Sequence, residues 1–124
     1  IKDEPGKDPA LIWLERLQEK PHQFMVPELF FNEMLGVFCR LLRDPHRINQ
    51  YMEALQDLGL ERLGNGRELL NLAANLSKKY SLSGYDAIYL ASAVLMKAKW
   101  LTADAAACRK ISRGDGESFI CLVE

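Results

Sequence analysis

Apolar residues are arranged along this chain in two different patterns. Five stretches show the three-to-four-residue spacing of amphipathic or buried helices, and a sixth, shorter helical stretch follows them. Four short apolar runs lie between or after these stretches and are typical of buried strands. The expected helices are 9–20, 27–43, 45–57, 67–80, 85–97 and 105–111, and the expected strands are 24–26, 60–63, 100–102 and 119–123.

The order of these elements predicts an α/β fold. The last apolar run, Phe119–Val123, is continuous rather than alternating, which is typical of a strand in a sheet with both faces covered by helices. Strands that alternate with helices along the chain pair in parallel. We therefore expect a single three-layer α/β/α domain with a parallel sheet over residues 1–124, a length that can bury a core without disulfides.

Two carboxylates occupy positions that this topology brings together. Asp86 lies in the first turn of the 85–97 helix, and Asp104 follows the 100–102 strand. In a parallel α/β fold, the start of a helix and the carboxyl end of a strand lie at the same edge of the sheet, where ligands bind. The sequence thus indicates a possible cation site. The alternative is that both residues only begin helices, with Asp86 at the third position of a capping box that starts at Ser83.

A third carboxylate, Glu33, interrupts the largely apolar 27–43 helix. Burying an unpaired charge costs several kcal/mol or forces protonation, so a carboxylate in such a helix needs an explanation. One interpretation is a narrow solvated stripe that Glu33 shares with Arg40, on the side opposite the core. The other is a functional role beside the two aspartates. A helix that is apolar nearly all round is buried on more than one face or packs against a partner chain.

The charge balance gives no global argument for binding a polyanion, because the formal net charge is −1. A nucleic acid would need a local basic patch or a bound cation. Arg109, Lys110 and Arg113 follow Asp104 and are candidates for phosphate contacts, although each could equally be a solvated surface charge. Tyr85 and Tyr89 could stack on a base, but their helical spacing favours packing in the core.

Several classes of protein find no support in the sequence. No apolar run approaches the roughly 20 residues of a membrane span, and no export leader is present, so we expect a cytoplasmic protein. Neither His22 nor His46 has a triad partner pattern, and both are expected at the surface. The three cysteines lack metal-binding spacing and are expected to be small buried hydrophobes in a reducing compartment, namely Cys39, Cys108 and Cys121.

Two sequence motifs surround the paired aspartates. The first is Tyr85-Asp86-Ala87-Ile88-Tyr89-Leu90-Ala91, preceded by Tyr80 and Ser83, and the second is Leu101-Thr102-Ala103-Asp104. Upstream lies Val26-Pro27-Glu28-Leu29, with Glu33 six residues after the proline. Over most of its length, this pattern resembles the PIN-domain nucleases, and most closely the VapC-type toxins of bacterial and archaeal toxin–antitoxin pairs.

The resemblance implies a PIN fold and a metal-dependent endoribonuclease. Glu33, Asp86 and Asp104 would be the catalytic acids that hold Mg²⁺ or Mn²⁺, and Thr102 would supply a supporting hydroxyl. The implied partners are an RNA substrate, an antitoxin protein that covers the acidic groove, and a second copy of the chain in a homodimer, to which the apolar 27–42 helix is suited.

One member of the family's acid cluster has no counterpart in the sequence. The family's first acid is an Asp at the end of a first strand, whereas Asp3 and Glu4 fall in the loop after that position. We therefore expect the N-terminal strand to be absent, through truncation or in a natural fragment. Two alternatives remain: a PIN-like scaffold that binds RNA or protein without cleaving it, and a parallel α/β domain whose acids are caps and surface charges.

Overall fold

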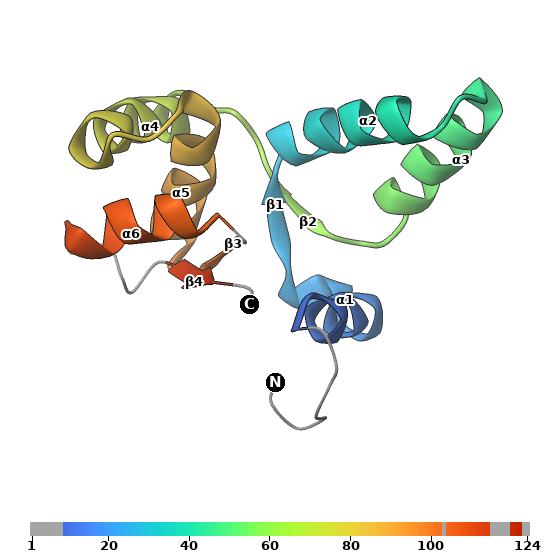
Figure 1. Ribbon diagram of the computed structural model, residues 1–124, viewed down its shortest axis with the longest axis horizontal. Coiled ribbons are helices and arrows are strands. Elements are labelled where there is room, and N and C mark those ends of the chain that lie inside the picture. The colour runs from blue at the N-terminus through green and yellow to red at the C-terminus, as the bar shows by residue number, and fades with distance from the viewer. Residues whose placement is uncertain (1–8, 103, 115–119, 123–124) are drawn as a thin grey trace. The chain divides into compact units, whose positions relative to one another are not determined.

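The computed structural model describes residues 9–102, 104–114 and 120–122, and has a mixed α/β fold with parallel strand pairs (Figure 1). The predicted parallel α/β fold class is confirmed. The chain divides into two compact units, which are described in turn: unit 1 comprises residues 1–13 and 65–124, and unit 2 comprises residues 14–64. The extent of the fold as a single domain stays a prediction.

Unit 2 is built from two helices between two parallel strands. The strands pair with Met25 opposite Glu61 and Pro27 opposite Leu63. The helix α1 (Pro9–Glu19), of which residues 14–19 fall in this unit, and a short 3₁₀ turn, η1 (Pro21–Gln23), precede them. The remaining elements are β1 (Met25–Pro27), α2 (Leu29–Leu41), α3 (Pro45–Gln56) and β2 (Glu61–Leu63).

The ends of α2 and α3 follow from local chemistry. The Asp44 carboxylate accepts a hydrogen bond from the His46 backbone N–H at 3.0 Å and caps α3, and Pro45 occupies the first helical position, so α3 begins at the predicted residue. The sequence predicted that Pro27 begins the second helix, but in the structure Pro27 is the last residue of β1. The reason is that the Glu28 N–H donates to Leu63 O at 3.0 Å and extends the strand pairing by one residue.

Aromatic contacts hold the elements of unit 2 together. Phe38 of α2 lies 5.5 Å from Tyr51 of α3 between ring centroids, and the Arg62 guanidinium of β2 lies 3.9 Å from the centroid of the buried Phe31 ring. Leu35 and Leu41 of α2 remain exposed, the latter at 74%. Within unit 2, therefore, the apolar surface of α2 is only partly covered.

Unit 1 contains three helices and the second strand pair. Its β3 pairs in parallel with β4, with Trp100 opposite Ile120 and Thr102 opposite Leu122. The helices α4 and α5 lie against each other, and α5 also contacts β3. The bounds are α4 (Arg67–Tyr80), α5 (Gly84–Met96), β3 (Trp100–Thr102), α6 (Ala105–Arg113) and β4 (Ile120–Leu122).

The core of unit 1 lies between its helices. Small residues on α5 allow a close approach, and Ala91 of α5 and Ile111 of α6 are fully buried. Ser92 is buried on the same helix, and its hydroxyl donates to Ile88 O at 2.8 Å, which removes the cost of an unpaired polar group. The remaining core side chains include Leu69, Ala73 and Leu76 of α4 and Ala87, Leu90 and Ala93 of α5.

Burial corrects two predictions from the sequence. Tyr85 was expected in the core, but 64% of its surface is exposed, because it lies at the second position of α5, before the helix enters the core. Cys39 is exposed on α2, whereas Cys108 is buried as predicted. The side chain of Cys121 lies outside the described part of the structure.

The predictions for both histidines are confirmed, because His22 and His46 are exposed. Tyr89 is half-buried and packs on Trp100, in agreement with the predicted packing role. Within the described residues, no helix is long and apolar enough to span a bilayer.

Candidate functional site

Asp86 lies in the first turn of α5, and the predicted cap of this helix is present. The Ser83 hydroxyl oxygen accepts a hydrogen bond from the Asp86 N–H at 3.1 Å. The Asp86 side chain is half-buried, as is typical of a residue at the rim of a core rather than in it. Its carboxylate therefore lies at the amino-terminal end of α5, where the helix dipole favours negative charge.

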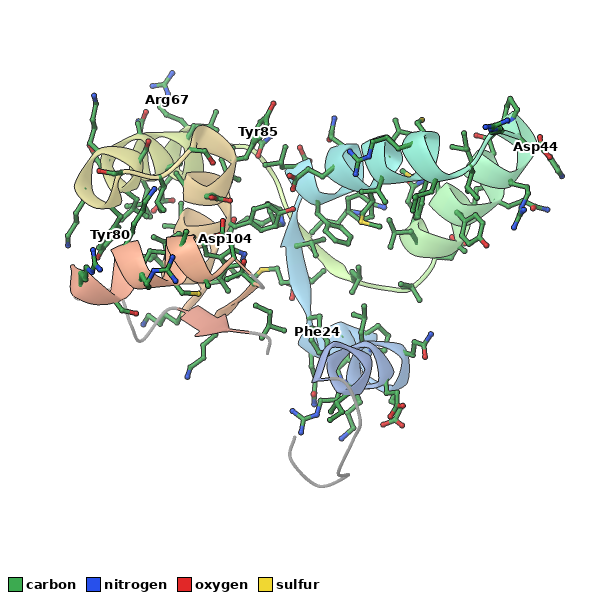
Figure 2. All side chains as sticks on the ribbon, in the orientation of Figure 1. Phe24, Asp44, Arg67, Tyr80, Tyr85 and Asp104 are labelled. Carbon is green, nitrogen blue, oxygen red and sulfur yellow. The ribbon has the colours of Figure 1, made fainter. Side chains whose placement is uncertain are left out.

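Asp104 links β3 to α6 and is held by two hydrogen bonds (Figure 2). Its Oδ1 accepts from the Ala107 N–H at 3.0 Å, which makes it the N-cap of α6. Its own N–H donates to Thr102 Oγ1, also at 3.0 Å. The structure thus brings together Thr102 and Asp104, two of the residues predicted for the site, and fixes the direction in which the carboxylate leaves the strand.

The chain between the two aspartates folds back on itself. Helix α5 ends at Lys97, which has a left-handed φ of 51°, and the Ala98 N–H donates to Ala93 O at 2.9 Å. β3 then runs back along α5, and Trp100 stacks on Tyr89 with ring centroids 5.9 Å apart. Asp86 lies one helical turn before Tyr89, and Asp104 follows Trp100 by four residues, so we expect both acids toward the amino-terminal end of α5.

Glu33 belongs to unit 2 and is exposed on α2, as is Arg40. This exposure removes the need to explain a buried charge, which was one reason for assigning Glu33 a function. Its membership of an acid cluster with the two aspartates stays a prediction.

The donor atoms of unit 1 suit a hard cation. Asp86, Asp104 and Thr102 offer only oxygen, the ligand type that Mg²⁺ and Mn²⁺ prefer. None of the described residues donates to Asp104 Oδ2, so this atom can accept a ligand while Oδ1 caps α6. In the described part of the chain, no three Asp, Glu, His or Cys side chains form a ready metal site.

The cations predicted to contact RNA lie on α6. Arg109 and Arg113 are exposed. Lys110 is also exposed, and its Nζ donates to Ser81 O at the end of α4, at 3.1 Å. This contact could not be read from the sequence, because it joins residues 29 positions apart. It joins α6 to the end of α4, whose last turn carries Lys78 and Lys79, where positive charge suits the helix dipole.

Comparison with known families gives one finding. The sequence model of the PIN domain matches residues 1–112, which is most of the chain. Neither the curated proteins nor the solved structures yield a significant match.

Proposed function

Because the chain belongs to the PIN domain family, whose members are generally nucleases, we propose that it is a metal-dependent endoribonuclease that hydrolyses RNA phosphodiester bonds. The observation that supports this proposal is the fold-back at Lys97 with the Tyr89–Trp100 stack, which runs β3 back along α5, the helix whose first turn holds Asp86. Two separate motifs thereby contribute acids to one region of unit 1.

In the proposed site, Glu33, Asp86 and Asp104 hold Mg²⁺ or Mn²⁺, and PIN domains generally use divalent metals. When bound, the cation supplies Lewis-acid polarisation of the scissile phosphate and of the attacking water. Converging carboxylates repel one another, so the cluster is favourable chiefly in the presence of that positive charge.

The protein's own contribution is orientation. Two hydrogen bonds orient Asp104: its Oδ1 accepts from the Ala107 N–H, and its own N–H donates to Thr102 Oγ1. Little conformational freedom is therefore lost when the carboxylate binds a ligand. Asp86 is held in the first turn of α5 behind Ser83. Glu33 acts as a direct ligand, as a ligand through water, or as the base for the attacking water.

The finer assignment is the toxin of a toxin–antitoxin pair in the cytoplasm. An antitoxin would neutralise it by covering the acidic groove. A second copy of the chain would cover the apolar surface of α2, and the exposure of Leu35 and Leu41 supports that part of the proposal.

A cleavage assay with matched variants tests the nuclease proposal. The purified protein is incubated with structured RNA and Mn²⁺ or Mg²⁺, alongside Asp86→Asn, Asp104→Asn and the control Glu68→Gln. Glu68 is an exposed acid of the same unit, in the first turn of α4, so its change removes an equal charge outside the site. We expect both Asp variants to lose roughly 100-fold or more in rate, as expected when a transition-state charge loses a stabilising group, and the control to retain activity.

A thermal melt gives a second readout. A cation that binds only the folded protein raises the melting temperature, so Mn²⁺ at millimolar concentration should shift the wild type and the Glu68→Gln control but not Asp86→Asn. Equal cleavage by the wild type and Asp86→Asn would overturn the site. Binding of RNA without cleavage or a metal-dependent shift would favour a non-catalytic PIN-like scaffold instead.

A further inference from the structure

Charge is distributed unevenly along the chain. Residues 65–114 contain eight Lys or Arg and three Asp or Glu, a formal net charge of +5, whereas the whole chain has −1. Two of the three acids in this segment are Asp86 and Asp104, which the proposed function already uses. The part of unit 1 that carries both aspartates is therefore strongly basic apart from them.

Tertiary contacts join the ends of the two helices that carry five of these eight cations. Lys110 Nζ donates to Ser81 O, and the Tyr80 hydroxyl donates to Gly114 O at 3.4 Å, so the end of α4 and the end of α6 are joined twice. Lys79 Nζ lies 5.2 Å from the centroid of the Tyr80 ring, at the same junction. The resulting basic surface consists of Lys78 and Lys79 of α4 and Arg109, Lys110 and Arg113 of α6, all exposed.

The two segments that carry the basic surface contain few acidic residues of their own. The sequence contains no Asp or Glu between Glu68 and Asp86, and none between Asp104 and Asp115. Cations in a last helical turn suit the helix dipole, which explains Lys78, Lys79, Lys110 and Arg113 singly but not Arg109. Five cations around two joined helix ends also repel one another, and that cost is offset when a polyanion binds and releases its own counterions.

An exposed aromatic ring lies close to this surface along the chain. Tyr85 follows Ser81 by four residues, across the loop that connects α4 to α5, and precedes Asp86 directly. Its 64% exposure contrasts with Tyr80 and Tyr89, which both pack inside unit 1. Proteins that bind single-stranded nucleic acid combine a basic track for the backbone with aromatic rings on which bases stack.

We propose that the basic surface binds the phosphate backbone of single-stranded RNA and that Tyr85 stacks on one of its bases beside Asp86. The proposal rests on the proposed function for the cleavage of the bound strand, but the binding itself requires neither metal nor cleavage. Lys110 has a positioning role, because its bond to Ser81 holds the two helix ends together.

Binding is measured by fluorescence anisotropy with a 5′-labelled, mixed-sequence RNA of about 12 nucleotides, in EDTA so that no cleavage occurs. The test variant is Lys78→Gln/Arg113→Gln, which removes one cation from each helix. The control is Arg67→Gln/Lys99→Gln, which removes the same charge from exposed positions of unit 1 outside the surface, with Arg67 at the other end of α4.

The salt dependence of binding identifies the contacts. Each phosphate contact with single-stranded RNA adds about 0.7 to the slope of log Kd against log salt concentration, so the test variant should lower that slope by about 1.4. At about 100 mM salt, this corresponds to roughly 10- to 30-fold weaker binding. The control should keep the wild-type slope, and all variants should keep the wild-type melting temperature. Equal slopes for the two double variants would overturn the proposal.

The stacking contact is tested with Tyr85→Ala and Tyr85→Phe. Loss of one stacked base should weaken binding by at least about fivefold in Tyr85→Ala without changing the salt slope, while Tyr85→Phe keeps the ring and the affinity. Weakening in Tyr85→Phe equal to that in Tyr85→Ala would contradict stacking. If an Asp- and Glu-rich peptide bound the basic surface and RNA did not, the surface would belong to a protein partner and the proposal would be wrong.

The two proposals fail in distinguishable ways. If RNA bound with the expected salt slopes but no variant cleaved it, the nuclease proposal would be wrong and the RNA-binding proposal would stand. If cleavage depended on Asp86 but was unaffected by Lys78→Gln/Arg113→Gln, the nuclease proposal would stand and the RNA-binding proposal would be wrong.

Discussion

Tyr89 and Trp100 stack with ring centroids 5.9 Å apart and ring planes 13° apart, which ties the middle of α5 to the start of β3. Their contact sets where β3 runs along the helix, and therefore where Asp104 emerges relative to Asp86. The two rings thus have a positioning role for the proposed site without belonging to it.

Removal of the Trp100 ring should destabilise unit 1 and reduce the Mn²⁺-dependent rise in melting temperature. We expect Trp100→Ala to lower the free energy of unfolding by about 2 kcal/mol, below the value for a fully buried Trp because this one is half-buried. Urea denaturation measures this loss. Tyr85→Ala, at an exposed tyrosine of the same helix, serves as the control and should change stability by less than about 0.5 kcal/mol. Similar losses in both variants would contradict a structural role for the stack.

Asp104 has two separable roles, as a helix cap and as a proposed ligand. Asp104→Asn keeps an oxygen for the Ala107 N–H and should leave stability nearly unchanged, because Asn and Asp cap helices about equally well. Asp104→Ala removes the cap and should cost about 1 kcal/mol. Both variants should lose the Mn²⁺-dependent rise in melting temperature. A full Mn²⁺ shift in Asp104→Asn would show that the carboxylate is only a cap.

Gly114 is required by its contact with Tyr80. A Cβ at this position would lie 2.8 Å from Tyr80 Cδ1, closer than real contacts allow, so Gly114→Ala should destabilise the protein by about 1–3 kcal/mol. Gly84 at the start of α5 has open space around its Cα, and Gly84→Ala should be neutral or stabilising by up to about 1 kcal/mol. Thermal melts of the two variants should therefore move in different directions or by clearly different amounts.

Lys97 ends α5 in a conformation that glycine adopts more easily. Its φ of 51° is unfavourable for a residue with a Cβ, so Lys97→Gly should raise the free energy of unfolding by about 0.5–1 kcal/mol after the greater entropy of the unfolded chain is included. Lys99→Gly, two residues on, relieves no strain and should lower it by a similar amount. Equal destabilisation by both substitutions, measured by urea denaturation, would contradict this account of the turn.

The helices and their beginnings could be predicted from the sequence because their signals are local. Asp44 with Pro45, and Ser83 with Asp86, cap α3 and α5 as the sequence predicts, and α4 has the predicted bounds. The parallel pairing of the strands also followed from their alternation with helices. For the candidate site, the sequence indicated both aspartates and the Thr102 hydroxyl that accepts the Asp104 N–H bond.

The remaining features depend on contacts between distant residues. Tyr85 and Tyr89 have the same helical spacing from apolar neighbours, and only the position of β3 decides that Tyr89 packs on Trp100 while Tyr85 stays exposed. The basic surface likewise depends on the bond from Lys110 to Ser81. The excess of positive charge in residues 65–114 can be counted from the sequence, but the net charge of −1 for the whole chain gives no sign of it.

The parallel strand pairs have a consequence for how the chain folds. Met25 meets Glu61 across 36 positions and Trp100 meets Ile120 across 20, whereas α2 and α3 are joined by residues 42–44 alone. Closing a longer loop costs more chain entropy, about 0.5 kcal/mol between these two separations, and distant pairings form slowly. In unit 2, we therefore expect the α2–α3 hairpin to form early from local contacts and the pairing of β1 with β2 to complete the unit late.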